Sequence, residues 1–317
     1  MRGVFLDAAT ISRGDLDLSP LRESLATLTL HDTTAAADLA DRLAGNEVVI
    51  NNKCRLDRGT LAANPQLRLI ALTATGYDCV DLDAVREQGV ALCNVRDYCT
   101  PSVVQHVFGM ILSLTHHLAR YDALARGGGW ARAPSFSEFA FPMRELEGRA
   151  LGIVGHGALG SAVGRVGEVF GMRVLVANRT GGEPQPGRLD LDTLLGEADV
   201  LSLHCPLNAA TRGLIGRREL GLMKPDALLI NTARGGLVDA DALADALRAG
   251  RLGGAGIDVL VQEPPVDGNP LLDPSLPNLI LTPHVAWAAR EARQRCIDEV
   301  AENIRAHARG QRRNRVD

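Results

Sequence analysis

The chain has 317 residues, of which 46% are hydrophobic, 23% charged and only 3% aromatic. This length predicts about two domains of roughly 150 residues each, and the composition excludes disordered and fibrous proteins and indicates cores of Ala, Leu and Val. The formal net charge of −4 argues against nucleic acid as the main partner.

No apolar run reaches the ~18 residues that a membrane span needs, and Asp7 interrupts the apolar start of the chain before it could form a signal peptide. Six cysteines are scattered along the chain without a CxxC pair. This pattern is typical of buried thiols in a reducing compartment and does not suggest a zinc site. We therefore expect a cytoplasmic protein with no membrane partner and no metal.

Short apolar segments alternate with helical patterns along the whole chain. Strands are predicted at 3–7, 47–51, 68–72, 91–95, 150–155, 172–177, 199–204, 227–232, 255–260 and 278–283. Helices are predicted at 33–44, 158–170, 239–249 and 288–308. This alternation predicts an α/β fold in which parallel sheets are wound with helices on both faces.

A long helix is predicted between the two sets of strands. Thr100 is a good N-cap, Pro101 suits the first helical position, and the helix should continue to Arg126. Such a helix can bridge two domains. We therefore expect a first domain of residues 1–97 plus a returning final helix, 285–317, and a second domain of residues 98–284.

The segment after this helix, about 127–147, has weak periodicity but carries aromatic bulk. It contains Trp130, Phe136, Phe139 and Phe141. Apolar side chains on an irregular excursion are more often a protein contact than a free loop. We interpret this segment as a dimerisation arm and expect a homodimer; the alternative is a flap packed on its own domain.

A GxGxxG pattern follows the predicted strand at 150–155 and opens the helix at 158–170. Gly155 permits a tight turn, Gly157 lets a pyrophosphate approach the backbone, and Gly160 lets helix and strand pack closely. The helix N-terminus offers amides to an anion. The loop therefore predicts a dinucleotide site formed by Gly155, His156, Gly157, Ala158, Leu159 and Gly160.

The strand at 172–177 ends without the acidic residue that usually binds the ribose of NAD. The window 172–182 contains no Asp or Glu but offers Asn178, Arg179 and Thr180. Arg179 can bind a 2′-phosphate, and no carboxylate in the window repels it. We therefore favour NADP(H) as the cofactor, while NAD(H) bound by Asn178, or a site for both cofactors, stays open.

Three residues of unusual chemistry follow later strands: Arg234, Glu263 and His284. Ligands of open α/β sheets bind outside the carboxyl ends of the strands, so these side chains point toward one crevice. Beside a dinucleotide loop they suit hydride transfer to a 2-keto acid. His284 would donate a proton, Glu263 would orient its ring, and Arg234 would bind the substrate carboxylate. Taken singly, each could be a solvated or structural residue.

Four stretches resemble the D-isomer-specific 2-hydroxyacid dehydrogenase family, and the likeness covers nearly the whole chain. They are GHGALG (155–160), INTARGGLVD (230–239), GAGIDVLVQEPP (254–265) and LTPHVAWAA (281–289). The resemblance is strongest to the glycerate dehydrogenase branch, which includes hydroxypyruvate and glyoxylate reductases. It implies a flavodoxin-like substrate domain and a Rossmann cofactor domain, both doubly wound parallel sheets, with a cleft between them. The implied reaction is NAD(P)H-dependent reduction of hydroxypyruvate or glyoxylate to the D-2-hydroxy acid.

The resemblance also assigns further residues. It implies cofactor contacts at Val104, His204, Cys205, Pro206, Thr232, Ala233, Asp258 and Ala286, with Asp258 on the nicotinamide carboxamide. It implies that backbone amides of Thr75 and Gly76 hold the substrate carboxylate, to which Lys53 could add positive charge. One departure is Gln105, where the family commonly has Glu before the histidine that is His106 here.

Alternative functions stay open at this point. Within the enzymes, the chain could be a D-lactate, formate or phosphoglycerate dehydrogenase; against the last of these, we expect no further regulatory module after the dehydrogenase core. From another class, it could be a nucleotide-sensing interaction protein like the corepressors that share this fold. Such proteins can retain the catalytic residues, so the trio alone does not exclude them.

Overall fold

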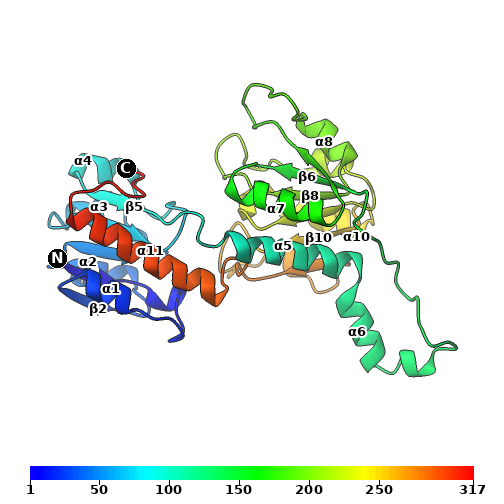
Figure 1. The fold of residues 1–317 in the computed structure, drawn as a ribbon, viewed down its shortest axis with the longest axis horizontal. Helices are drawn as coiled ribbons and strands as arrows, with labels where there is room; N and C mark the ends of the chain where they lie inside the picture. The colour runs from blue at the N-terminus through cyan, green and yellow to red at the C-terminus, as the bar shows by residue number, and fades with distance from the viewer. The chain divides into compact units, whose positions relative to one another are not determined.

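The computed structural model describes all residues, 1–317, and divides into two compact units (Figure 1). Unit 1 comprises Met1–Cys99 and Trp287–Asp317, and unit 2 comprises Thr100–Ala286. Both boundaries fall two residues after the expected ones, at 99 instead of 97 and at 286 instead of 284. No helix is both long and apolar enough to cross a membrane.

Unit 1 is built on a parallel sheet with the strand order β2-β1-β3-β4-β5. Successive strand residues point to opposite faces, so two separate cores form. One core holds Phe5, Ile50 and side chains of the last helix, and the other holds Val4 and Val49. The strands are β1 (Arg2–Phe5), β2 (Thr27–Leu30), β3 (Val48–Asn51), β4 (Leu69–Leu72) and β5 (Ala91–Cys93). The helices are η1 (Ala8–Thr10), α1 (Ser19–Ser24), η2 (Ala36–Asp38), α2 (Leu39–Leu43), α3 (Arg58–Ala62), α4 (Leu82–Gln88) and α11 (Arg290–Ala308).

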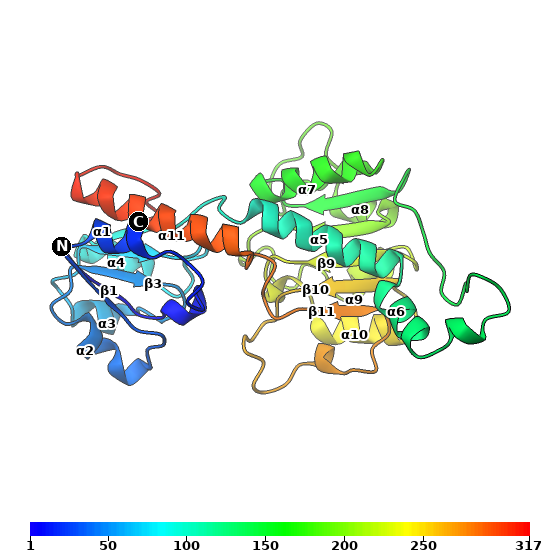
Figure 2. The ribbon, with the colours of Figure 1, turned by 60° about the horizontal axis from the view of Figure 1, so that its bottom comes forward.

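Unit 2 is built on a second parallel sheet with the strand order β11-β10-β9-β8-β6-β7, of which β9, β10 and β11 are labelled in Figure 2. Helices α5 and α7 contact one face, and the core of the other face includes side chains of α8, α9 and α10. The strands are β6 (Ala150–Val154), β7 (Arg173–Val176), β8 (Val200–Leu203), β9 (Leu228–Asn231), β10 (Gly254–Ile257) and β11 (Leu279–Leu281). The helices are α5 (Thr100–Thr115), α6 (Leu118–Arg126), η3 (Trp130–Arg132), α7 (Ala158–Val169), α8 (Leu191–Glu197), α9 (Arg217–Leu222), η4 (Gly235–Leu237), α10 (Ala240–Arg248) and η5 (Pro270–Leu272).

The strand order of unit 2 reverses direction at β6. The chain passes from β6 to β7 on one side and then returns to β8 on the other. In open α/β sheets this switch point, at the carboxyl ends of the strands, is where ligands bind. The glycine loop that follows β6 therefore lies at the expected ligand-binding edge.

The predicted helix from 100 to 126 is wrong in two respects. It is two helices, because His117 has a φ of 49°, in the left-handed region, and a right-handed helix cannot continue through it. Thr100 is not an N-cap, because α5 begins at Thr100 itself and the Thr100 hydroxyl is buried without a hydrogen-bond partner.

The segment after α6 projects from the rest of unit 2 in both ribbon views (Figures 1 and 2). Trp130, Phe136 and Phe139 are 57%, 89% and 83% exposed, so they do not pack on their own unit as a flap would. Phe141 differs, because the Arg120 guanidinium lies 3.8 Å above its ring.

The close contact between Gly160 and the glycine loop gives a stability prediction. A Cβ at Gly160 would lie 2.0 Å from the Gly155 carbonyl oxygen, whereas a Cβ at Gly157 would meet no atom within 4 Å. Gly160→Ala should therefore lower the free energy of unfolding by about 1–3 kcal/mol. The control Gly157→Ala should change it by less than about 0.5 kcal/mol. Chemical denaturation of the apoprotein, followed by circular dichroism, measures both, and equal effects would contradict this packing.

Candidate active site

The glycine loop has the shape of a phosphate cradle. Gly155 turns with a φ of 95°, and a Cβ there would lie 2.5 Å from the Cys205 amide nitrogen, so the loop packs tightly on the end of β8. Gly157 differs, because the space above its Cα is open. The amides at the start of α7 follow it directly. A dinucleotide pyrophosphate fits this opening and this helix N-terminus.

A second feature that fits a cofactor lies at the end of β9. The Thr232 hydroxyl is buried and has no hydrogen-bond partner in the protein. Buried polar groups are nearly always paired, so an orphaned hydroxyl beside a ligand edge suits a bound polar group. Thr232 is one of the residues expected at the nicotinamide end.

A cavity of about 240 Å³ lies at the end of β7 and is lined by Asn178, Arg179 and Thr180, among others. Arg179 is exposed and its guanidinium has no hydrogen bond or ion pair. Asn178 is partly engaged, because its Oδ1 accepts a hydrogen bond of 2.9 Å from the Gln185 amide. The cavity can therefore present a guanidinium to an anionic ligand.

The same cavity has an acidic residue that the sequence window did not include. Asp190 lines it and caps α8, because its carboxylate accepts hydrogen bonds from the Thr193 amide and hydroxyl at 2.9 and 2.7 Å. The hydroxyl and the amide of Thr193 lower the pKa of Asp190. Its position as an N-cap was the only sequence signal for it, and nothing there indicated the cavity.

The residues after β8 form a neutral wall beside the glycine loop. The His204 Nε2 lies 2.8 Å from the Ser202 hydroxyl, and burial lowers the pKa of His204 to about 4, so the ring is neutral. Burial raises the pKa of the Cys205 thiol, which therefore stays protonated. Pro206 follows on the surface.

His284 and Glu263 form a close pair in unit 2. The His284 Nδ1 lies 2.5 Å from the Glu263 Oε2, and the Leu260 amide donates to the other carboxylate oxygen at 2.8 Å. A carboxylate only accepts, so the proton of this bond belongs to His284 Nδ1. His284 has a φ of 55°, an uncommon conformation that clusters at functional sites.

Arg234 follows β9, so the three expected reacting residues leave the adjacent strands β9, β10 and β11. The Arg234 Nη1 donates to the Ala233 carbonyl at 2.8 Å, and Asn231 Nδ2 donates to the Arg234 carbonyl at 2.9 Å. These bonds hold the turn at the end of β9. The structure thus brings the three residues to one edge of the sheet.

Asp258, an expected cofactor contact, lies within a network of protein hydrogen bonds. Its side chain is fully buried, and its carboxylate accepts from the Thr282 hydroxyl and the amides of Val285 and Ala286. Each oxygen thus accepts at least one hydrogen bond from the protein. Asp258 holds the segment that carries His284, and two further expected contacts near the nicotinamide, Val104 and Ala286, are also buried.

The expected substrate contacts other than Arg234 and His284 lie in unit 1. The Thr75 hydroxyl donates to the Val95 carbonyl at 2.7 Å, Gly76 follows it, and Lys53 is exposed. The Lys53 amide donates to Asp7 at 2.7 Å. Burial raises the pKa of Asp7, while amide hydrogen bonds oppose the shift. Asp7 thus holds the loop that carries Lys53, a role for which the sequence carries no signal.

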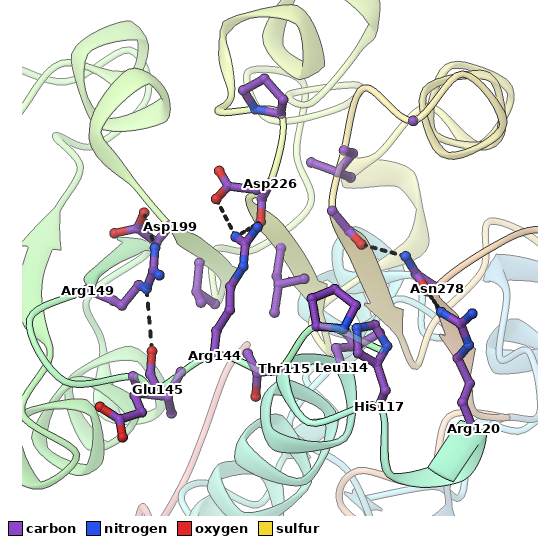
Figure 3. A pocket seen from close by; sticks show the side chains of 18 residues that line it. Leu114, Thr115, His117, Arg120, Arg144, Glu145, Arg149, Asp199, Asp226 and Asn278 are labelled. Carbon is purple, nitrogen blue, oxygen red and sulfur yellow. Dashed lines mark hydrogen bonds and ion pairs between the residues drawn. The ribbon is translucent and has the colours of Figure 1, made fainter. Parts of the chain in front are cut away.

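The larger cavity of unit 2, about 330 Å³, lies at the opposite edge, around the amino ends of the strands (Figure 3). Arg144 pairs with Asp226, and Arg149 lies 3.6 Å from Asp199. Four of its charged side chains thus pair with one another, and none of the expected site residues lines it. We do not place the active site there.

Comparison with known proteins identifies the family of the chain. Residues 108–286 match the family model described as D-isomer specific 2-hydroxyacid dehydrogenase, NAD binding domain. The chain is 44% identical to the glycerate dehydrogenase of Methylorubrum extorquens over 285 residues, which is 90% of each chain. It is 32% identical to the hydroxypyruvate reductase of Blautia hydrogenotrophica over 98% of each chain.

Solved structures give the same result for the fold. The TT0316 protein from Thermus thermophilus matches with a TM-score of 0.86 and 35% identity over 100% of both chains. An acyclic imino acid reductase in complex with NADPH and D-Arg matches with a TM-score of 0.88 and 26% identity, also over 100% of both chains. The expected fold of two parallel α/β sheets is confirmed. This chain is an oxidoreductase that uses a nicotinamide cofactor, and it belongs to the D-isomer-specific 2-hydroxyacid dehydrogenase family.

Proposed function

We propose that the protein reduces a small 2-keto acid, hydroxypyruvate or glyoxylate, to the D-2-hydroxy acid with NADPH. The observation that carries this proposal is the His284–Glu263 pair of 2.5 Å at the sheet edge that also carries Arg234 and the glycine loop. The names of its relatives, a glycerate dehydrogenase and a hydroxypyruvate reductase, support the choice of substrate.

The roles of the residues follow from the charge that develops on the substrate. The bound nicotinamide cofactor supplies a hydride to the keto carbon. Arg234, a planar fork of donors, holds the substrate carboxylate and the keto oxygen. His284 donates the proton on Nε2 to that oxygen as negative charge builds on it. Glu263 keeps a proton on Nδ1 and stabilises the charged ring, so the ring has the right orientation for transfer.

Replacement of His284 tests the proton donor. His284→Ala should lower kcat for hydroxypyruvate by roughly 10²–10⁴-fold, the usual contribution of a positioned acid. The dissociation constant for NADPH should stay near the wild-type value, because the glycine loop is untouched. His116→Ala, a histidine outside the site, is the matched control. A His284→Ala enzyme with wild-type kcat, when hydride transfer limits turnover, would contradict the assignment.

The preference for NADPH rests on the cavity at the end of β7. Arg179 lines it and has no protein partner, so it can bind a 2′-phosphate without losing an ion pair. Asp190 lies on the same cavity and opposes a second negative charge, although the hydrogen bonds of Thr193 disperse its charge. We propose that the Arg179 contact outweighs this repulsion, because bidentate guanidinium–phosphate contacts are among the strong charge-assisted hydrogen bonds.

Two variants test the cofactor choice. A charge-assisted contact contributes about 1.5–3 kcal/mol, so Arg179→Ala should weaken NADPH binding by roughly 10–150-fold and NADH binding little. Asn178→Asp should shift the preference toward NADH by restoring the missing carboxylate. Asp190→Asn, which keeps an N-cap oxygen, should favour NADPH further. Measured kcat/KM for each reduced cofactor decides this, and a wild-type enzyme that prefers NADH would refute the proposal.

We also propose that the protein is a homodimer joined through the segment 127–147. Two phenylalanine side chains of this arm, Phe136 and Phe139, are 89% and 83% exposed, and monomeric proteins rarely expose such groups together. Burial of these rings against a second copy would remove apolar surface from water.

Light scattering tests the dimer. The wild-type protein should have a mass near twice the 33.8 kDa of the chain at low micromolar concentration. The double variant Phe136→Ser, Phe139→Ser should shift toward the monomer. The control Val169→Ser removes an apolar side chain that is 85% exposed but lies outside the arm, and it should leave the mass unchanged. A wild-type monomer would rule out the proposed arm contact.

A further inference from the structure

The segment that carries His284 is held from two sides within unit 2. From the end of β10, the Asp258 carbonyl accepts from the His284 amide at 2.7 Å. The Asp258 carboxylate accepts from Thr282, Val285 and Ala286 at 2.5 to 2.9 Å. From α5, the Ser102 hydroxyl donates to the Ala286 carbonyl at 2.7 Å, and the His106 Nε2 lies 3.0 Å from the Thr282 hydroxyl.

The direction of the hydrogen bonds in this cluster follows from its chemistry. An ionised carboxylate can only accept, so the Thr282 hydroxyl gives its single proton to Asp258. The Thr282 oxygen can then only accept from the histidine, and His106 must carry a proton on Nε2. The His106 Nε2 also lies 3.7 Å from the Asp258 Oδ1, so it is close to the buried carboxylate itself.

The positions on α5 suit this contact. Ser102 and His106 are four residues apart, so they lie on the same face of the helix, and both reach the segment 282–286. The intervening Gln105 is exposed and its side chain makes no hydrogen bond. The departure at Gln105 therefore does not touch the cluster, whereas His106 is part of it.

Two features make such a cluster necessary. The Asp258 side chain is fully buried, and a buried carboxylate is stable only when its oxygens are hydrogen-bonded or paired with a charge. His284 holds a left-handed backbone with a φ of 55°, which persists only where the surroundings fix it. The same Asp258 meets both needs, because its carboxylate and its carbonyl bind the two sides of His284.

We propose that His106 is a positioning residue of the reaction. Its Nε2 proton fixes the Thr282 hydroxyl, the hydroxyl fixes the Asp258 carboxylate, and Asp258 fixes the backbone of His284. The histidine itself touches no reacting atom. This inference rests on the proposed role of His284 as proton donor, and it predicts a loss of turnover without a loss of cofactor affinity.

Paired variants test each link of this chain. Thr282→Val removes the hydroxyl but keeps the shape, and Thr282→Ser keeps the hydroxyl. His106→Met removes the Nε2 donor, and His106→Gln places an amide donor at similar reach. Gln105→Met, on the neighbouring exposed position of α5, is the matched control. Each protein is assayed for kcat and KM with hydroxypyruvate, for NADPH binding by fluorescence and for its Tm.

Thr282→Val and His106→Met should each lower kcat by roughly tenfold to a hundredfold, as small misplacements of a catalytic group do. Thr282→Ser and His106→Gln should retain most of the turnover. The double variant Thr282→Val, His106→Met should be no worse than the poorer single variant, because both act through one hydrogen-bond chain. NADPH affinity should stay near wild type, and Gln105→Met should keep kcat within about twofold.

Three results would overturn the proposal. One is a wild-type kcat in Thr282→Val and His106→Met. Another is a fall in Tm with kcat unchanged, which would mean a merely structural cluster. The last is strictly multiplicative losses in the double variant. His284→Ala, assayed in parallel, separates this failure from a failure of the proposed function: wild-type kcat there refutes the proton donor, while a dead His284→Ala beside active His106 variants refutes only the positioning role.

Discussion

The hydrogen bond from the His284 ring to the Glu263 carboxylate is the interaction on which the proposed chemistry depends. It measures 2.5 Å and joins two loops that leave the neighbouring strands β10 and β11. This bond places a proton on His284 Nδ1, the nitrogen that faces Glu263. Nε2 is then the ring nitrogen that can act on the substrate. The Leu260 amide, 2.8 Å from the second Glu263 oxygen, keeps the carboxylate from turning away.

The parallel sheet explains why these side chains meet at all. Arg234, Glu263 and His284 are far apart in sequence, but their strands are adjacent and end at one edge. Because β9 and β10 are buried on both faces, their register is strongly fixed, and the loops that follow them start from fixed positions. The loops can then hold uncommon conformations, such as the left-handed backbone of His284, at the cost of local strain that the rest of the unit supports.

The sequence was sufficient to predict the sheets because their strands are short apolar runs, and all ten predicted strands occur within a few residues of their expected positions. The strand β2 was missed because Thr27–Leu30 is an edge strand that alternates Thr with Leu over only four residues. No proline or glycine adjoins His117, so the sequence carries no signal for the helix break there. Local pattern does not predict a backbone conformation that tertiary contacts impose.

The candidate site also contains parts that the sequence predicts and parts that it does not. The roles of Gly155 and Gly160 were predictable, because glycines at this spacing between a strand and a helix are typical of a dinucleotide-binding loop. The hydrogen bonds that bury Asp258, and the approach of Asp190 to the cavity beside Arg179, join residues whose contact depends on the folded chain. The spacing of residues along the sequence does not predict these contacts. The part of the site that orients the reacting groups could therefore be described only from the structure.

The most direct test is to identify the product that the enzyme forms from hydroxypyruvate and NADPH. The purified enzyme is given hydroxypyruvate and NADPH, and cofactor oxidation is followed together with chiral analysis of the glycerate formed. The account predicts one D-glycerate for each NADPH consumed and no L-isomer. No turnover with either hydroxypyruvate or glyoxylate, or formation of L-glycerate, would contradict it.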